Sequence, residues 1–290
     1  MQPHLPIGQN GKMNLPVLKN YRERFPFKLA TTSYIYPDKI VPNVIRLGPF
    51  FDEIELVLFE SGRQDSIPND RQINHLIELS LLHRVGFNIH LPIDISLGDE
   101  SEKVRASGVS VVRRVIQKTL RLNPSFYVLH LDFINPPTLP SLRRREGEFM
   151  QEMDIEAWRL RLIRSLKEIL EDGMESKRIA IETLGYPFEW IEDVVKEFGF
   201  SICLDIGHIL MNGYDLDHYF KAYLPGTSTI HLHGVQNGSD HLGIDALPGP
   251  DLSLILSILH HYHGIVSIEV FSINALKSSL STLEEKWIKS

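Results

Sequence analysis

Histidine, aspartate or glutamate stands at or near the end of six successive short apolar runs in this 290-residue sequence. These residues are His90, His130, Glu182, Asp205, His231 and Glu269. Imidazole nitrogens and carboxylate oxygens, with no thiolate among them, are ligands that Zn, Mn and Fe accept. A set of this size exceeds what one catalytic ion needs. The pattern therefore predicts a site for two or three divalent metal ions, about 3.5–4 Å apart and bridged by carboxylates.

The string LDIGHILMNGYDL places a further histidine close to one of these carboxylates. Asp205 ends the apolar run, and His208 follows it by three residues. Gly207 and Gly213 permit the chain to turn into a helix, so we expect His208 to reach the same end of the fold. In the plainer alternative, Asp205 is a helix N-cap and His208 is a surface residue.

The string IHLHGVQNGSDHLGI adds three more candidates. His231 and His233 are two residues apart, so they share one side of an extended strand. Asp240 and His241 follow in a glycine-flanked loop that we expect to fold back over the site. His241 is expected to reach the same end of the fold, and His233 and Asp240 are predicted to contact the substrate. The alternatives are a core position for His233 and a turn position for Asp240.

The elements that must position these side chains are short β-branched or aromatic runs, which alternate with segments of helical period. The sequence predicts eight strands, over Lys28–Thr31, Glu53–Leu58, Phe87–Leu91, Tyr127–Leu131, Arg178–Glu182, Ser201–Asp205, Thr229–Leu232 and Ile265–Glu269. It predicts helices over Asn69–His83, Glu102–Leu122, Asp154–Glu171, Pro187–Phe198, Leu216–Tyr223, Leu252–Tyr262 and Ala275–Trp287. Several runs are almost entirely apolar, which is typical of parallel strands buried on both faces.

Eight strand–helix units in about 260 residues predict a single-domain α/β fold, the (β/α)8 TIM barrel. We expect the barrel over residues 27–290 and an irregular N-terminal extension over residues 1–26. A doubly wound open sheet is the alternative, but the first strand is not followed by the glycine-rich turn of its dinucleotide-binding form. A barrel gathers the carboxyl ends of its strands at one rim, where catalytic groups lie. The metal site is therefore expected at that rim.

Two further features lie next to predicted strand ends. The long irregular stretch Asp132–Glu148 follows the fourth strand and contains Arg143 and Arg144. Long loops within compact domains are often functional, so we expect these arginines to contact the substrate at the rim. A solvated charge run is the alternative. Glu60 follows the second strand, which also contains Glu55, and is another candidate for substrate contact.

Composition and charge limit the classes of function. Hydrophobic residues make up 43% of the chain, which is typical of a globular protein, and the single cysteine excludes a disulfide framework. A net charge of −7 disfavours non-specific binding to nucleic acid. The sequence shows no apolar run near the length of about 20 residues that crosses a bilayer, and no signal-peptide core in residues 1–26. We expect a cytoplasmic enzyme that acts on a small molecule, without nucleic-acid or membrane partners; its oligomeric state is left open.

The sequence is similar to the xylose-isomerase-like TIM-barrel superfamily, which includes apurinic-site endonucleases of the endonuclease IV type and many sugar isomerases and epimerases. NIHLPIDISLG around His90 resembles the His-x-Pro segment of the family, and IETLG at Glu182 resembles its Glu-Thr strand end. LDIGHILMNGYDL resembles its Asp-x-x-His…Gly-Tyr-Asp string. The resemblance spans about residues 27–270.

This resemblance implies a division of the candidate ligands. The metal quartet shared across the superfamily corresponds to Glu182, Asp205, His231 and Glu269. The additional ligands typical of the multi-zinc phosphodiesterase branch correspond to His90, His130, His208 and His241. It implies two or three divalent ions, Zn or Mn, with Glu182 and Glu269 as the catalytic residues. The endonuclease pattern has Asp two residues before the last histidine, where this sequence has Ser239, so a two-ion site remains as open as a three-ion site.

The stretch Thr31–Ser61 resembles the cobamide-remodelling phosphodiesterases of the same superfamily, which cut the nucleotide loop of vitamin B12-type corrinoids. This resemblance implies a metal-dependent hydrolase with a corrinoid substrate. The first alternative is a divalent-metal sugar or sugar phosphate isomerase or epimerase, in which Glu182 and Glu269 shuttle a proton. The surplus of histidines argues against it. An apurinic-site endonuclease is disfavoured by the acidic charge, and a non-catalytic metal-stabilised barrel is a further alternative.

Overall fold

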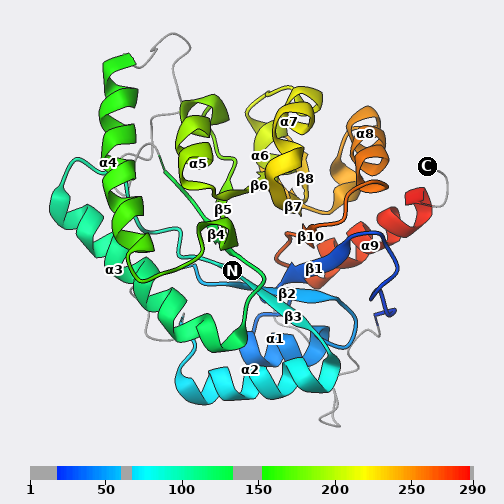
Figure 1. Cartoon of the computed structure of the whole chain (residues 1–290). Coiled ribbons are helices and arrows are strands. Elements are labelled where there is room, and N and C mark those ends of the chain that lie inside the picture. Colours follow the sequence, from blue (N-terminus) through cyan, green and yellow to red (C-terminus); the bar gives the residue numbers. More distant parts are fainter. Residues whose placement is uncertain (1–17, 60–66, 133–151, 288–290) are drawn as a thin grey trace, which may run out of the picture.

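Eight parallel strands close into a barrel surrounded by helices (Figure 1). The computed structural model describes residues 18–59, 67–132 and 152–287. The strands are β1 Lys28–Thr32, β2 Glu53–Val57, β3 Gly86–His90, β4 Tyr127–Leu129, β5 Ile179–Glu182, β6 Ser201–Asp205, β7 Thr227–Leu232 and β10 Ile265–Ile268. They follow the order β1-β10-β7-β6-β5-β4-β3-β2, and β1 pairs with both β2 and β10. The predicted single-domain TIM barrel is therefore confirmed.

The helices lie outside the strands and alternate with them along the chain (Figure 1). The α-helices of the described residues are α1 Ile40–Leu47, α2 Asp70–His83, α3 Glu102–Thr119, α4 Glu152–Leu170, α5 Glu192–Phe198, α6 Ile206–Met211, α7 Leu216–Tyr223, α8 Gly249–Leu259 and α9 Ile273–Trp287. Short 3-10 turns occupy Leu120–Leu122, Ser176–Arg178, Phe188–Trp190, Leu224–Gly226 and Ile244–Ala246. Among these residues no helix has the length and apolar character that a membrane span requires.

Three local expectations are wrong. The helix predicted over Pro187–Phe198 is divided into the turn Phe188–Trp190 and helix α5. Helix α1 is absent from the predicted helices, because it is short and carries Pro42 in its first turn, a position that tolerates proline, whereas α6 begins at the N-cap Asp205 that the sequence analysis weighed as an alternative. The expected loop around His241 is an antiparallel hairpin, β8 Gly234–Gln236 and β9 Ser239–Leu242. Its turn has Asn237 and Gly238 at φ 52° and 76°, as a two-residue hairpin turn requires.

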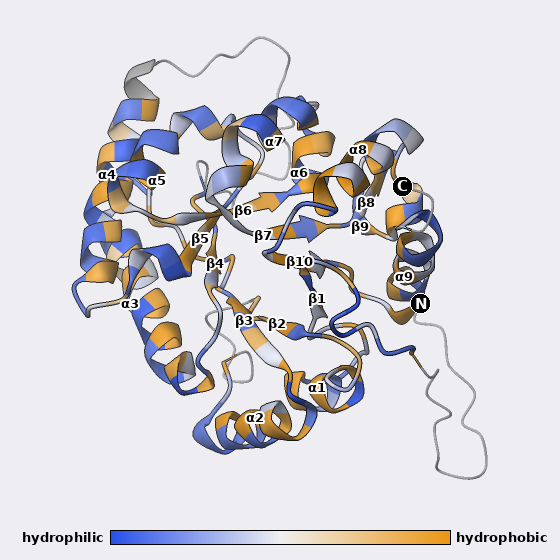
Figure 2. Cartoon of the chain, turned by 45° about the vertical axis from the view of Figure 1, so that its right-hand side comes forward, coloured by the Kyte–Doolittle hydropathy of each residue, from blue (hydrophilic) through white to orange (hydrophobic). Residues whose placement is uncertain are grey.

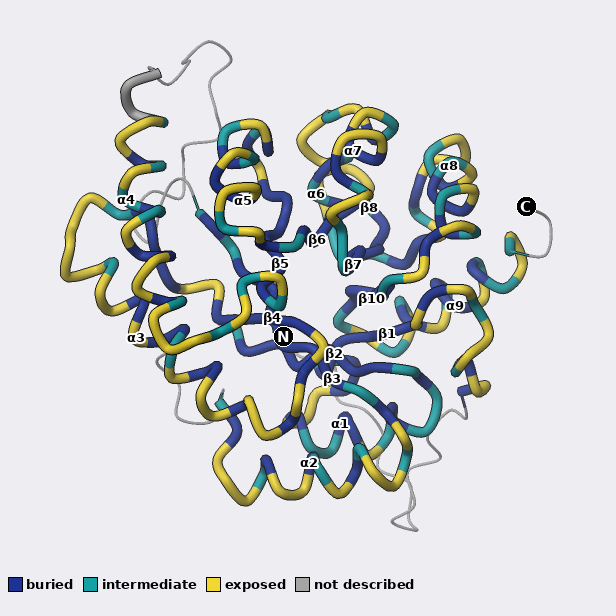
Figure 3. The backbone as a smooth tube through the Cα atoms, viewed as in Figure 1, coloured by how far each residue is buried: buried dark blue, intermediate teal, exposed yellow. Residues whose placement is uncertain are grey.

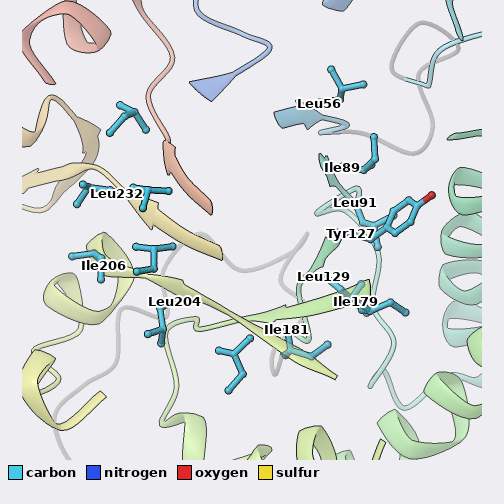
Figure 4. Close-up of a cluster of buried hydrophobic side chains, with 14 of the residues drawn as sticks. Leu56, Ile89, Leu91, Tyr127, Leu129, Ile179, Ile181, Leu204, Ile206 and Leu232 are labelled. Atoms are coloured by element: carbon cyan, nitrogen blue, oxygen red, sulfur yellow. The ribbon is translucent and has the colours of Figure 1, made fainter. Parts of the chain in front are cut away.

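Successive side chains of each strand point in turn toward the surrounding helices and toward the barrel interior. Ile89, Leu129, Ile181 and Leu204 belong to the main core cluster, which also contains helix side chains (Figure 4). The alternate positions of the strands contribute to a second, smaller cluster, which consists of Ala30, Phe126, Val128, Ala180, Cys203 and Ile265. The longer helices turn buried residues toward the strands and exposed residues outward (Figure 3), and they carry both apolar and polar residues (Figure 2). Polar side chains gather at both ends of the interior, with His90, Glu182 and Asp205 at the carboxyl ends of the strands and Glu53 at the amino end of β2.

The chain before β1 also contacts the barrel. Leu18 and Tyr21 are buried, and the Tyr21 backbone N–H donates to the carbonyl oxygen of Phe50 at 2.9 Å. Residues 18–26 form no helix or strand. The boundary at residue 27 stays a prediction, since residues 1–17 lie outside the described ranges.

Candidate metal centre

The carboxyl ends of six neighbouring strands bring the predicted ligands together. Strands β3, β5 and β6 end at His90, Glu182 and Asp205, and His231 is the penultimate residue of β7. His130 and Glu269 follow β4 and β10. These positions lie at one end of the barrel because parallel strands point the same way. His90, Glu182, Asp205, His231 and Glu269 are all buried, the most exposed at 4%.

The first group of donors is the predicted quartet. One ligand atom from each of Glu182, Asp205, His231 and Glu269 lies within 4.8 Å of the others. His231 Nδ1 is 3.2 Å from Glu269 Oε2, 3.5 Å from Glu182 Oε1 and 3.7 Å from Asp205 Oδ2. In the described part of the chain, His231 Nδ1, Glu182 Oε1 and Glu269 Oε2 have no hydrogen-bond partner. Buried polar atoms without partners are costly, and a cation among these four donors would satisfy them.

The second group contains two histidines directed at one oxygen of Glu182. His130 Nε2 and His90 Nε2 lie 2.8 Å and 3.1 Å from Glu182 Oε2. His90 Nδ1 lies 2.9 Å from the carbonyl oxygen of Leu91, which can only accept, so Nδ1 carries the proton and Nε2 is free to bind a cation. Glu182 therefore contributes Oε1 to the first group and Oε2 to the second, the arrangement of a bridging carboxylate.

The third group consists of His208, His233 and His241, whose ligand atoms also lie within 4.8 Å of one another. His233 Nε2 is 3.1 Å from Asp205 Oδ1, so Asp205 links this group to the quartet. His233 is fully buried, and its ring packs so closely on Gly207 that a Cβ at Gly207 would overlap it. His233, which the sequence predicts to contact the substrate, is one of the candidate donors of this group.

The hairpin β8–β9 positions His241 in this group. The backbone of His241 has φ 50°, a left-handed conformation that non-glycine residues adopt rarely and mostly at constrained sites. Its N–H donates to His233 Nδ1 at 2.9 Å, and the two rings stack with centroids 4.3 Å apart. Ser239, at the place where the endonuclease pattern has Asp, is exposed. His233 therefore lies between Asp205 and His241 and contacts both of them.

Of the other residues predicted to contact the substrate, the structure describes Asp240 alone. Asp240 Oδ2 lies 4.0 Å from His241 Nε2, and the Asp240 side chain is 40% exposed. Glu60, Arg143 and Arg144 lie outside the described residues.

Charges within the site shift the pKa values of its carboxyl groups. Burial raises the pKa of Glu182, but the nearby His130 and His231 outweigh this effect and hold the pKa well below its usual range. Asp205 behaves in the same way, with His208 and His233 as the counter-charges. These carboxylates therefore stay ionised and available as ligands.

The imidazoles show the opposite shift. Burial lowers the pKa of His90, but its hydrogen bond and charge interaction with Glu182 raise the net pKa to about 9. Asp205 likewise raises the pKa of His233 to about 9, against the effect of burial. Without an ion, protons on these rings compensate the carboxylates, and a divalent cation would take over that charge balance.

Two residues next to the quartet differ in their suitability as ligands. Glu55 of β2 is fully buried, its Oε1 lies 3.2 Å from His231 Nε2, and one of its oxygens lies within 4.8 Å of ligand atoms of His90, His231 and Glu269, so it is itself a candidate ligand. The sequence alone led to no predicted role for Glu55. The signal that could have indicated one is that Glu53 and Glu55 share one face of an otherwise apolar strand. Cys203 is also near His231, but burial raises the pKa of its thiol well above the usual value, so it stays a neutral side chain.

A closed parallel barrel whose strand ends gather buried histidines and carboxylates defines a TIM barrel with a candidate metal centre. Residues 44–290 match the family described as xylose isomerase-like TIM barrel, and the chain belongs to this family. The resemblance to that superfamily seen in the sequence is confirmed; the narrower resemblance to the cobamide branch stays a prediction. No curated protein matches the sequence.

Solved structures with the same fold include several enzymes. A D-tagatose 3-epimerase-like protein is 21% identical with a TM-score of 0.66, over 91% of this chain and 97% of that chain. Endonuclease IV from Thermus thermophilus is 16% identical with a TM-score of 0.65, over 89% and 99%. The IOLI protein with a binding zinc atom is 17% identical with a TM-score of 0.66, over 91% and 99%. At these identities the likeness establishes the fold.

Proposed function

We propose that this protein is a metal-dependent hydrolase that cleaves a phosphodiester in a small molecule. The observation that carries the proposal is the presence of several overlapping groups of donors, three of which are joined through Glu182 and Asp205. A single-ion enzyme uses only the quartet and leaves the other histidines without a task. Hydrolysis of a phosphodiester benefits from several cations, because charge develops on both the attacking and the leaving oxygen.

The exposure of the donors indicates how a substrate would approach. The side chains of His130, His208 and His241 are 15%, 20% and 25% exposed, whereas those of His231 and Glu182 are 0% and 1% exposed. The three more exposed histidines therefore form the open side of the site. Divalent cations held there would act as Lewis acids and lower the pKa of coordinated water to about 7. Glu182 would hold the two inner positions together, and Glu269 would close the site from the side of β10.

The finer proposal is that the phosphodiester belongs to the nucleotide loop of a cobamide. An aromatic row supports it, in which Phe271 lies 4.8 Å from His241, Phe59 lies 5.5 Å from Phe271, and Tyr34 lies 4.7 Å from Phe59, measured between ring centroids. Tyr34 and Phe59 belong to the stretch that resembles the cobamide-remodelling enzymes. A nucleotide has a flat base close to its phosphate, and half-buried aromatic side chains beside the donors suit such a group.

A sugar isomerase or epimerase is the second candidate. Glu182 Oε1 and Glu269 Oε2 lie 3.5 Å and 3.2 Å from the same atom, His231 Nδ1, so two carboxylates that could transfer a proton border one position. Epimerases among the proteins of similar fold also favour it.

Metal content and turnover distinguish the two candidates. We expect two or three Zn or Mn ions per chain by elemental analysis, and release of a cobinamide-type product from cobamides. The assay panel includes simple phosphodiesters and ketoses. One ion per chain together with ketose interconversion would replace the hydrolase proposal by the epimerase.

A further inference from the structure

The imidazole of His231 has a different environment on each of its two nitrogens. Nδ1 faces Glu182, Asp205 and Glu269 at 3.2–3.7 Å, whereas Nε2 faces Glu55 Oε1 at 3.2 Å. A neutral imidazole carries one proton, and the nitrogen that binds a cation must be the one without it. We propose that Glu55 is a positioning residue, which accepts the Nε2–H of His231 and thereby keeps the Nδ1 lone pair directed at the quartet.

Other histidines of the site have their proton placed by the backbone. Nδ1 of His90, His208 and His241 lies 2.9, 3.1 and 3.2 Å from a carbonyl oxygen, which can only accept a hydrogen bond. The Nε2 atoms of these rings are therefore left for a cation. In the described chain neither ring nitrogen of His231 has a hydrogen-bond partner, so no backbone group fixes its tautomer. Glu55 is the acceptor that faces the nitrogen needing one.

The buried carboxylate of Glu55 also needs a hydrogen-bond donor. Its side chain is fully buried, and its Oε1 lies 3.2 Å from His231 Nε2 without the alignment of a hydrogen bond, so that within the described residues neither carboxylate oxygen has a hydrogen-bond partner. A buried carboxylate is costly unless it is paired. A cation withdraws electron density from the imidazole that binds it, so the ring N–H of a metal-bound histidine is a strong hydrogen-bond donor. A carboxylate that accepts this hydrogen bond orients the ring and increases its strength as a ligand.

Glu53 shows that a buried carboxylate on the same strand can be satisfied without the site. It lies two residues before Glu55 on the same face and is fully buried as well. Its oxygens contact Lys28 Nζ at 3.0 Å, Ser125 Oγ at 2.7 Å and Asn88 Nδ2 at 3.4 Å. Glu53 therefore belongs to the opposite end of β2 and has no contact with the donors, which makes it a matched control.

The inference rests on the proposed metal centre and is tested by metal affinity. The zinc affinity of purified full-length protein is measured by competition with a chelator for the wild type, Glu55→Gln, Glu55→Leu and Glu53→Gln. Loss of an outer carboxylate typically weakens metal binding about 10- to 100-fold. We expect the affinity to fall about tenfold in Glu55→Gln, whose amide oxygen still accepts a hydrogen bond, and further in Glu55→Leu. We expect no such loss in Glu53→Gln, and an unchanged number of ions per chain at saturating zinc.

A second measurement follows the proton itself. In zinc-loaded protein with ¹⁵N-labelled histidine, the His231 ring is expected as the Nε2–H tautomer, with its proton signal altered in Glu55→Gln. Equal zinc affinity in the wild type and both Glu55 variants would overturn the positioning role. Loss of one whole ion in Glu55→Leu, with the others bound as before, would also overturn it, because Glu55 would then be a ligand. A wild-type protein that binds no divalent ion would remove the proposed function as well.

Discussion

Asp205 Oδ1 accepts the backbone N–H of His208 at 2.6 Å, so one carboxylate ends strand β6 and begins helix α6. The helix cap and the metal candidate, which the sequence presents as alternatives, are the same residue. Its Oδ2 faces His231 while Oδ1 also meets His233, and the capped helix directs His208 toward the site. The local turn and the donor geometry therefore depend on each other.

Two substitutions at Asp205 separate these roles. Asparagine caps helices about as well as aspartate, whereas alanine loses about 1 kcal/mol. We expect the metal-free Asp205→Asn protein to be more stable than Asp205→Ala by about that amount in chemical unfolding. Both variants should lose zinc affinity, because both lack the carboxylate. Equal stability of the two variants would show that the cap contributes nothing.

His130→Ala tests the multi-ion site. His130 Nε2 approaches Glu182 Oε2 and belongs to the second group of donors but not to the quartet. We expect this variant to bind fewer ions per chain and to lose most hydrolysis, with the quartet ion retained. His208→Ala should reduce the ion count in the same way through the third group. The control is His218→Ala, because the His218 side chain is 56% exposed and pairs with Glu189. Unchanged ion content in both site variants would contradict a multi-ion site.

The raised histidine pKa values predict a pH dependence of metal-free stability. The folded pKa of His90 and of His233 is about 9, above the ordinary value of 6.5. A group whose pKa is raised by folding stabilises the protein fully below its unfolded pKa and loses that effect as the pH rises through its folded pKa. In the presence of a chelator, unfolding midpoints should therefore fall as the pH increases from about 7 to about 10.

Zinc should reverse this trend. Protons compete with the cation for the same nitrogens, so the apparent zinc affinity should rise with pH until about 9, by up to about tenfold per pH unit for each displaced proton. Calorimetry in two buffers of different ionisation enthalpy measures the protons released. Zinc binding at about pH 7 without proton release would argue against protonated rings in the metal-free site.

The aromatic row predicts a selective effect on substrate binding. Stacking of two aromatic rings contributes about 0.5–1.5 kcal/mol beyond burial. Phe59→Leu should raise KM up to about tenfold for a phosphodiester with a flat base, with little change in kcat and no change for an alkyl phosphodiester. Phe25→Leu is the control, because Phe25 packs on Phe27 and Trp287 away from the donors. An equal effect on both substrates would exclude stacking by Phe59.

The sequence predicts the strand ends well because they depend on local pattern. Apolar runs that end in His, Asp or Glu place His90, Glu182 and Asp205 correctly, and parallel strands then require a shared rim. The hairpin around His241 was missed although Asn237–Gly238 is a strong turn signal. The contact between Glu55 and His231 could not be predicted in this way. It joins β2 to β7, which are not neighbours in the barrel, so it depends on how far the strands are staggered when the sheet closes.

The hairpin that holds His241 has a consequence for how such proteins diversify. Both the histidine and the position occupied by Ser239 lie on β9, outside the closed barrel. Evolution can therefore exchange ligands on this small appendage while the packed interior stays intact. A few replacements in one surface ribbon would be enough to convert a scaffold that carries fewer cations into one that carries more.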